Sequence, residues 1–265
     1  MTPADLRELV TDVAARAARV GALPDAAEAG PPEGPLFRPI DPRDAGVVAD
    51  WGSPVALRWA PALGLEPREL ADLLAARLVA DRRISAVEVA PTGWLALTVT
   101  DLARAAVIPA ILAAPDRYAV PVGIVVPEVP DELPGSRSPG EPVMTIQRAH
   151  ARQCRRIRNA SAAGVESRAS DRLEELTHVS ERVLLVTLAD LPQRLARHPG
   201  DRDRMLAAAL EVARRADAWI HPERPMSVGE HIRPVHGARL SLATATRHVL
   251  RTGLHLLGAS APERM

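Results

Sequence analysis

The sequence predicts a small α+β domain, with helices on an antiparallel sheet, followed by an all-α helical bundle. Residues 84–90 and 94–99 alternate apolar and polar side chains and flank a Pro-Thr-Gly turn, which is typical of a β-hairpin. Residues 127–142 hold five prolines and two glycines, the composition of a stiff, exposed linker. Beyond that stretch only helical periodicity is strong. The expected domains are residues 1–126 and residues 143–265, joined by the linker 127–142.

Helix-start signals divide the first domain into its elements. Thr2 offers a capping hydroxyl, Pro3 suits the first helical position, and Asp5 adds an acid to the first turn. Similar signals recur along the domain. They predict a helix from residue 2, a loop over 24–46, helices from 53–54 and 66–67, the hairpin, and a helix from 101 to about 114.

Apolar residues at helical spacing predict the elements of the bundle. The last helix places Arg247, Arg251 and His255 on the side opposite Leu242 and Val249. Cations also suit the C-terminal end of a helix dipole, which is the alternative explanation for this row. The helices are expected near residues 143–161, 171–188, 191–198, 202–220 and 239–257.

Composition restricts the class of protein. The chain of 265 residues is 47% hydrophobic and 25% charged, as in ordinary globular domains, and no apolar run reaches the roughly 20 residues of a membrane helix. Cys154 is the single cysteine and cannot form an internal disulfide, so a reducing cytoplasm is expected. Every basic residue other than histidine is arginine, which excludes lysine-dependent chemistry.

A zero net charge conceals two halves of opposite sign. Residues 1–140 carry 13 Arg against 19 acidic residues, and residues 141–265 carry 20 Arg against 14. A polyanion would therefore be drawn to the second half. At about 100° per residue, the helix at 143–160 sets Arg148, Arg152 and Arg155 opposite a core face. The core face is formed by Ile146, His150, Cys154 and Ile157, and Arg156 and Arg158 flank the arginine row.

No acid lies between residues 148 and 158, whereas a merely solvated face usually carries acids for i,i+4 pairs. The arginine row therefore favours a phosphate backbone as partner. Aromatic residues are only 2% of the chain, so base stacking would depend on Trp219 or on guanidinium planes.

Neither a metal site nor a catalytic site is indicated. His150 and Cys154 are spaced i,i+4, but a structural metal needs four ligands and no second pair has suitable spacing, so a buried imidazole and a buried thiol are favoured. No nucleophile accompanies a base at a readable spacing, and no cofactor motif is found. Catalysis of any kind thus ranks below binding.

The end of the sequence resembles the C-terminus of arginyl-tRNA synthetases, where a helix ending in Leu-Gly leads into Ala-Pro-Glu-Arg-Met, here residues 261–265. Residues 147–152 resemble the signature helix of the same anticodon-binding domain, Gln-Tyr-Ala-His-Ala-Arg, with Arg148 in place of the tyrosine. The first domain resembles the N-terminal additional domain of that family over residues 50–58, 63–64, 67–71, 87–90 and 93–95. Pro54 and Ala96 stand where that family usually has asparagines.

This resemblance implies an N-terminal additional domain fused to a DALR-type anticodon-binding bundle, without the nucleotide-binding domain and its His-Ile-Gly-His and Lys-Met-Ser-Lys-Ser motifs. It implies a non-catalytic, cytoplasmic tRNA-binding protein, with an arginine tRNA as one candidate; the run lengths and ligand spacings described above predict no membrane or metal partner. The alternative is a protein-interaction or regulatory module that no longer binds RNA. The expected tRNA-binding residues are Arg148, Arg152, Arg155, Arg156, Arg247, Arg251, Arg264 and Met265.

Overall fold

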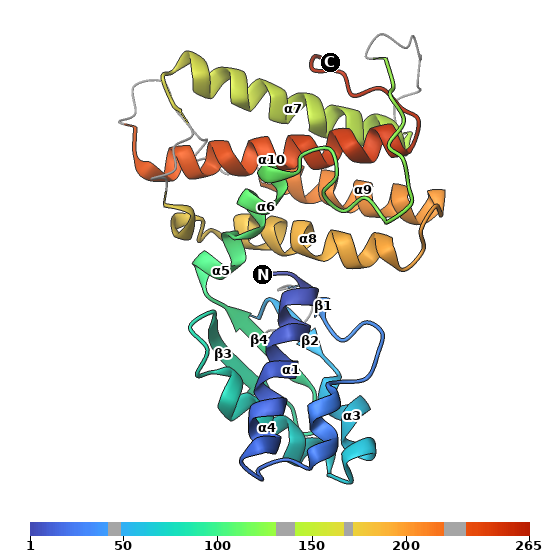
Figure 1. The fold of residues 1–265 in the computed structure, drawn as a ribbon. Helices are drawn as coiled ribbons and strands as arrows, with labels where there is room; N and C mark the ends of the chain where they lie inside the picture. Colours follow the sequence, from blue (N-terminus) through green and yellow to red (C-terminus); the bar gives the residue numbers. More distant parts are fainter. Residues whose placement is uncertain (42–48, 131–140, 167–171, 220–231) are drawn as a thin grey trace. The chain divides into compact units, whose positions relative to one another are not determined.

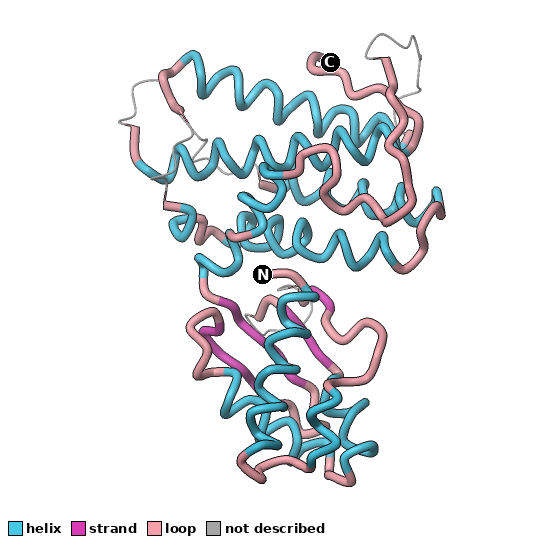
Figure 2. The backbone as a smooth tube through the Cα atoms, in the orientation of Figure 1, coloured by secondary structure: helices cyan, strands magenta, loops and turns pink. Residues whose placement is uncertain are grey.

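A computed structural model describes residues 1–41, 49–130, 141–166, 172–219 and 232–265. The chain forms two compact units, Met1–Arg104 and Ala105–Met265 (Figure 1). The first combines a small antiparallel sheet with helices, and in the described part of the second all regular structure is helical, as predicted (Figure 2).

The first unit is built on a four-stranded antiparallel sheet in the order β1-β2-β4-β3. The predicted hairpin is present as β3 (Ile84–Val89) and β4 (Leu95–Val99). Leu95, Leu97 and Val99 alternate with more exposed neighbours, so one face of β4 is buried. The short strands β1 (Arg38–Pro39) and β2 (Trp51–Ser53) were not predicted, because two or three residues carry no readable periodicity.

The helices of this unit begin where the sequence predicts. Thr2 and Asp5 form a reciprocal capping box at the start of α1 (Pro3–Arg19), with the Thr2 nitrogen 2.7 Å from an Asp5 carboxylate oxygen. The predicted loop contains a 3-10 turn, η1. Gly93 turns the chain between β3 and β4 at φ +90°, where a Cβ would lie 2.8 Å from the Pro67 carbonyl oxygen. The remaining elements are η1 (Asp25–Ala29), α3 (Val55–Leu63), α4 (Pro67–Leu78) and α5 (Asp101–Ala105).

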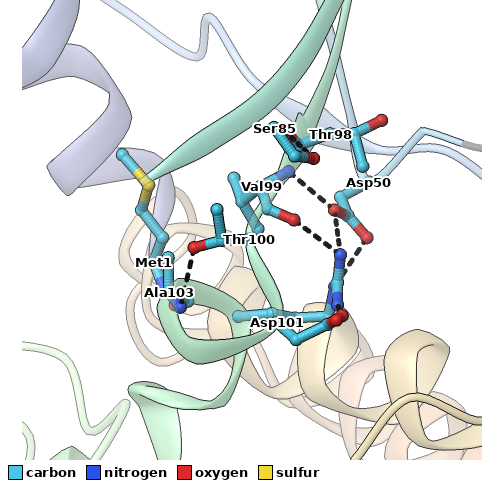
Figure 3. A network of polar contacts seen from close by, with 9 residues as sticks. Met1, Asp50, Ser85, Thr98, Val99, Thr100, Asp101 and Ala103 are labelled. Carbon is cyan, nitrogen blue, oxygen red and sulfur yellow. Dashed lines mark hydrogen bonds and ion pairs between the residues drawn. The ribbon is translucent and has the colours of Figure 1, made fainter. Parts of the chain in front are cut away.

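A buried ion pair closes the end of the sheet (Figure 3). The Arg104 guanidinium donates to both carboxylate oxygens of Asp50, at 2.9 and 2.8 Å, and to the Val99 carbonyl at 2.7 Å. Asp50 also accepts from the Val99 amide at 2.9 Å. The side chains of Arg104 and Asp50 are only 2% and 3% exposed, so the Asp50 carboxylate is compensated by Arg104, which also forms an ion pair with the more exposed Asp101.

The helix predicted from residue 101 to about 114 is broken into α5 and α6 (Val107–Ala113). Pro109 has no amide hydrogen for the carbonyl four residues earlier, Ala105, which is where α5 ends. In the second unit α6 packs against α8 and α10. The division into compact units therefore falls between Arg104 and Ala105, whereas the sequence placed the domain boundary after residue 126. Residues 131–140 of the predicted linker lie outside the described residues.

The second unit packs its long helices around α10. They are α7 (Pro142–Ala162), α8 (Val179–Ala196), α9 (Arg202–Ala218) and α10 (Pro234–Leu256), with the 3-10 turn η2 (Leu173–Glu175) before α8. Helix α10 contacts α6, α7 and α9 and is buried along most of its length (Figure 1). It begins at Pro234, earlier than the predicted residue 239.

The helices predicted at 171–188 and 191–198 are one helix, α8, that begins at Val179 and continues through Pro192. Pro192 leaves the Leu188 carbonyl without its usual helical donor. The Tyr118 hydroxyl donates to that carbonyl at 2.9 Å. A long-range hydrogen bond thus replaces the one that proline removes.

Candidate nucleic-acid interface

Helix α7 separates a buried face from an exposed one, as its spacing predicts. Ile146, His150 and Cys154 are 0%, 2% and 3% exposed, whereas Arg148 and Arg155 are exposed. Burial lowers the pKa of the His150 imidazole and raises the pKa of the Cys154 thiol, so both are neutral core groups at neutral pH. No group of three potential metal-ligating side chains occurs among the described residues.

The arginine row of α7 is not a uniform exposed surface. Arg152 Nη1 lies 2.7 Å from Asp217 Oδ2 on α9, and the Arg156 guanidinium lies 4.8 Å from the centroid of the Trp219 ring. Arg156 also donates to Gln153 at 3.2 Å, and burial lowers its pKa. Both cations therefore hold α7 against the end of α9. Trp219 is only 5% exposed and covered by Arg156, so it does not offer the base-stacking surface that the sequence suggested.

Arg158 also has an internal partner. Its two terminal nitrogens lie 3.4 and 3.3 Å from the Glu263 carbonyl oxygen, and Nη1 lies 3.8 Å from a carboxylate oxygen of the same residue. Beyond Glu263, Arg264 and Met265 are exposed, and the Met265 side chain retains 63% of its accessible surface. A single exposed apolar side chain is ordinary on a protein surface, so the exposure of Met265 alone does not indicate a contact.

The cations of α10 are less available than the sequence predicts. Arg247, Arg251 and His255 are all half-buried. Arg251 forms an ion pair with Asp116, from the segment after α6. Arg247 lies 3.3 Å from the Nε2 atom of His248, and the pKa of His248 is lowered by burial and then by the nearby positive charges. This end of α10 is thus a partly covered basic patch.

Three arginines remain as the most accessible cations of the predicted set: Arg148, Arg155 and Arg264. Each is exposed, and none has an ion pair within the described part of the chain. They come from α7 and from the segment that follows α10. Guanidinium groups that are not neutralised locally can contact phosphates with little loss of other interactions.

The first unit carries a cation–aromatic pair, formed by exposed Arg38 and half-buried Trp94, that the sequence did not reveal. The Trp94 ring lies so close to Gly52 that a Cβ there would be 3.0 Å from the ring, and the Arg38 guanidinium lies 4.7 Å from its centroid. Gly52 pairs with Ala96 across β2 and β4, so Ala96 lies in the same region of the sheet. Only pairing of strands far apart in the sequence brings these residues together.

Comparisons with known proteins match the two parts of the chain separately. The DALR anticodon binding domain matches residues 146–265, and the arginyl tRNA synthetase N terminal domain matches residues 7–99. The arginine–tRNA ligase of Clavibacter sepedonicus is 39% identical over 134 residues, which are 49% of this chain and 24% of the ligase. The arginine–tRNA ligase of Kineococcus radiotolerans is 39% identical over 132 residues, with the same shares. The aligned part thus spans about a quarter of these relatives.

No described helix combines the length and hydropathy needed to cross a bilayer.

Proposed function

Because the chain joins an arginyl-tRNA synthetase N-terminal domain to a DALR anticodon-binding domain, we propose that it binds tRNA without aminoacylating it. An arginine tRNA is the first candidate, since the curated relatives are arginine–tRNA ligases. The cytoplasm is the compartment that such a role requires.

The observation that carries the proposal is the placement of Arg148, Arg155 and Arg264. All three lie within the DALR match, are exposed, and have no ion pair among the described residues. The surplus of arginine over acidic residues in residues 141–265 adds a favourable field for a polyanion. Arg247 and Arg251 are proposed to extend this surface, once the Asp116 pair of Arg251 yields to a phosphate.

The absence of an internal catalytic segment supports a non-catalytic role. Only residues 100–145 separate the two matched segments, and the chain has no lysine. Adenylate formation requires cations placed at the ATP phosphates and a pocket for the amino acid. A segment of that length, in which α6 packs against α8 and α10, is too short to provide them.

Two assays test the proposal. In a mobility-shift titration, tRNA should bind, and it should bind more weakly as salt rises from about 50 to about 200 mM. Arginine-dependent ATP–pyrophosphate exchange by the purified protein should stay at background. Clear exchange activity would overturn the non-catalytic role, and absence of a shift at the lower salt concentration would overturn tRNA binding.

A second candidate function is an interaction module that regulates another protein. It is favoured by Arg148 at the position of the family's signature tyrosine and by Pro54 and Ala96 at its usual asparagines. The internal engagement of Arg152 and Arg156 also reduces the cationic surface available to RNA. This candidate replaces the first one if the unaltered protein shows no tRNA shift at low salt.

A further inference from the structure

The segment 259–265, which follows α10, returns onto α7. Ala259, Ser260 and Ala261 are 1%, 8% and 2% exposed, whereas Arg264 and Met265 are exposed. The segment therefore consists of a buried part followed by an exposed part. The exposed part carries one of the three accessible arginines of the predicted interface.

Side chains of α7 contact this segment at successive points. Gln147 Nε2 donates to the Ser260 carbonyl at 2.9 Å and lies 3.3 Å from its hydroxyl. His150 Nδ1 lies 3.0 Å from the Pro262 carbonyl, which can only accept, so this ring nitrogen carries the proton. Farther along the helix, Arg158 reaches the Glu263 carbonyl. The contact points advance in the same direction along both partners, so the segment runs parallel to α7.

We propose that three side chains of α7 act as positioning residues that hold this segment in place: Gln147, His150 and Arg158. By fixing residues 260–263, they present Arg264 and Met265 to RNA together with the exposed arginines of α7. The inference rests on the proposed tRNA binding and adds to it a layer of residues that do not themselves contact RNA.

Burial supports a positioning role for the two uncharged members. Gln147 and His150 are 7% and 2% exposed, so neither can meet a phosphate directly. Burying an amide and an imidazole is unfavourable unless their polar atoms find partners, and here those partners are atoms of the segment. Apolar side chains would fill the same space on a helix that only needed to pack.

A mobility measurement tests the contact without RNA. Cys154 is the single cysteine and is buried, so Cys154→Ala combined with Met265→Cys allows a spin label at residue 265 alone. Gln147→Leu should make the label more mobile. Gln153→Leu is the matched control. It also removes a buried amide from α7, but the side chain of Gln153 accepts from Arg156 and forms no hydrogen bond with residues 259–265 among the described residues. Equal label mobility in the two variants would overturn the proposal.

A double-mutant cycle then tests the effect on RNA. Gln147→Leu should weaken tRNA binding about three- to tenfold, the range expected from loss of its hydrogen bonds. Arg264→Gln should weaken binding in the unaltered protein but add little in the Gln147→Leu background, because the segment is already displaced. Full independence of the two effects would overturn the positioning role. If the unaltered protein binds no tRNA, the proposed function fails, while the label still decides whether Gln147 holds the segment.

Discussion

Removing Arg148 and Arg155, the two exposed arginines of α7 that have no ion pair among the described residues, should weaken tRNA binding and reduce its dependence on salt. Arg148 and Arg155 are exposed and have no ion pair within the described residues, so each can release one counterion per phosphate contact. The slope of log K against log salt should fall in magnitude by about 0.7 to 0.9 for each contact, or about 1.4 to 1.8 for Arg148→Gln/Arg155→Gln. At about 0.1 M salt this corresponds to roughly 25- to 60-fold weaker binding.

A matched variant separates local contacts from net charge. Arg197 and Arg204 are exposed in the same unit, so Arg197→Gln/Arg204→Gln removes the same two charges at a different surface. Filter binding of tRNA at several salt concentrations should show a much smaller slope change for this control. Thermal midpoints should be unchanged for both variants, because surface substitutions without specific partners cost within about 0.5 kcal/mol. Equal slopes for the two variants would refute the assignment of the site to α7.

Three further outcomes are expected. Arg104→Met should lower the free energy of unfolding by about 3–5 kcal/mol in urea titrations, because the buried Asp50 carboxylate would lose the guanidinium that compensates its charge. A loss below about 1 kcal/mol would contradict the role of the buried pair. Burial lowers the pKa of folded His150 below its unfolded value of about 6.5, so the unfolded chain binds more protons and stability falls as pH drops below about 6.5. His150→Gln should flatten that fall. Tyr118→Phe should cost about 1–3 kcal/mol by leaving an α8 carbonyl without a donor, measured by the thermal midpoint.

Capping and alternation patterns predicted the elements whose conformation depends mainly on residues close together in the sequence. The capping box at Thr2 and the alternation in residues 84–89 and 95–99 are complete within a few residues, so α1 and the β3–β4 hairpin are where the sequence places them. Pro109 and Pro192 show the limit. Pro109 lies in the first turn of α6, just after the break from α5, whereas Pro192 lies inside α8, where the Tyr118 hydroxyl donates to the carbonyl that this proline leaves without a helical donor.

The placement of residues 105–126 depends on packing of the same kind. The sequence predicts that residues 101 to about 114 form the last helix of the first domain, yet α6 packs on α8 and α10 of the second unit. Tyr118 bonds to α8, and Thr252 on α10 donates to the Pro115 carbonyl at 3.2 Å. Their partners are 70 and 137 residues away in the chain. The periodicity of one helix cannot identify contacts with residues so far away in the chain. The Pro- and Gly-rich composition of residues 127–142 was therefore the signal from which the sequence predicted the domain boundary.

The same reasoning explains why only part of the arginine row remains an RNA surface. Helical periodicity fixes the angle of each side chain around α7 but not which neighbour lies at that angle. Arg152 meets Asp217 and Arg158 meets Glu263, and both acids lie far from α7 in the sequence. Counting arginines therefore overstates the number of phosphate contacts that the helix can make. The accessible cations must instead be collected from α7 and from the segment after α10, which is why the position of that segment, and of Arg264 within it, determines the extent of the proposed interface.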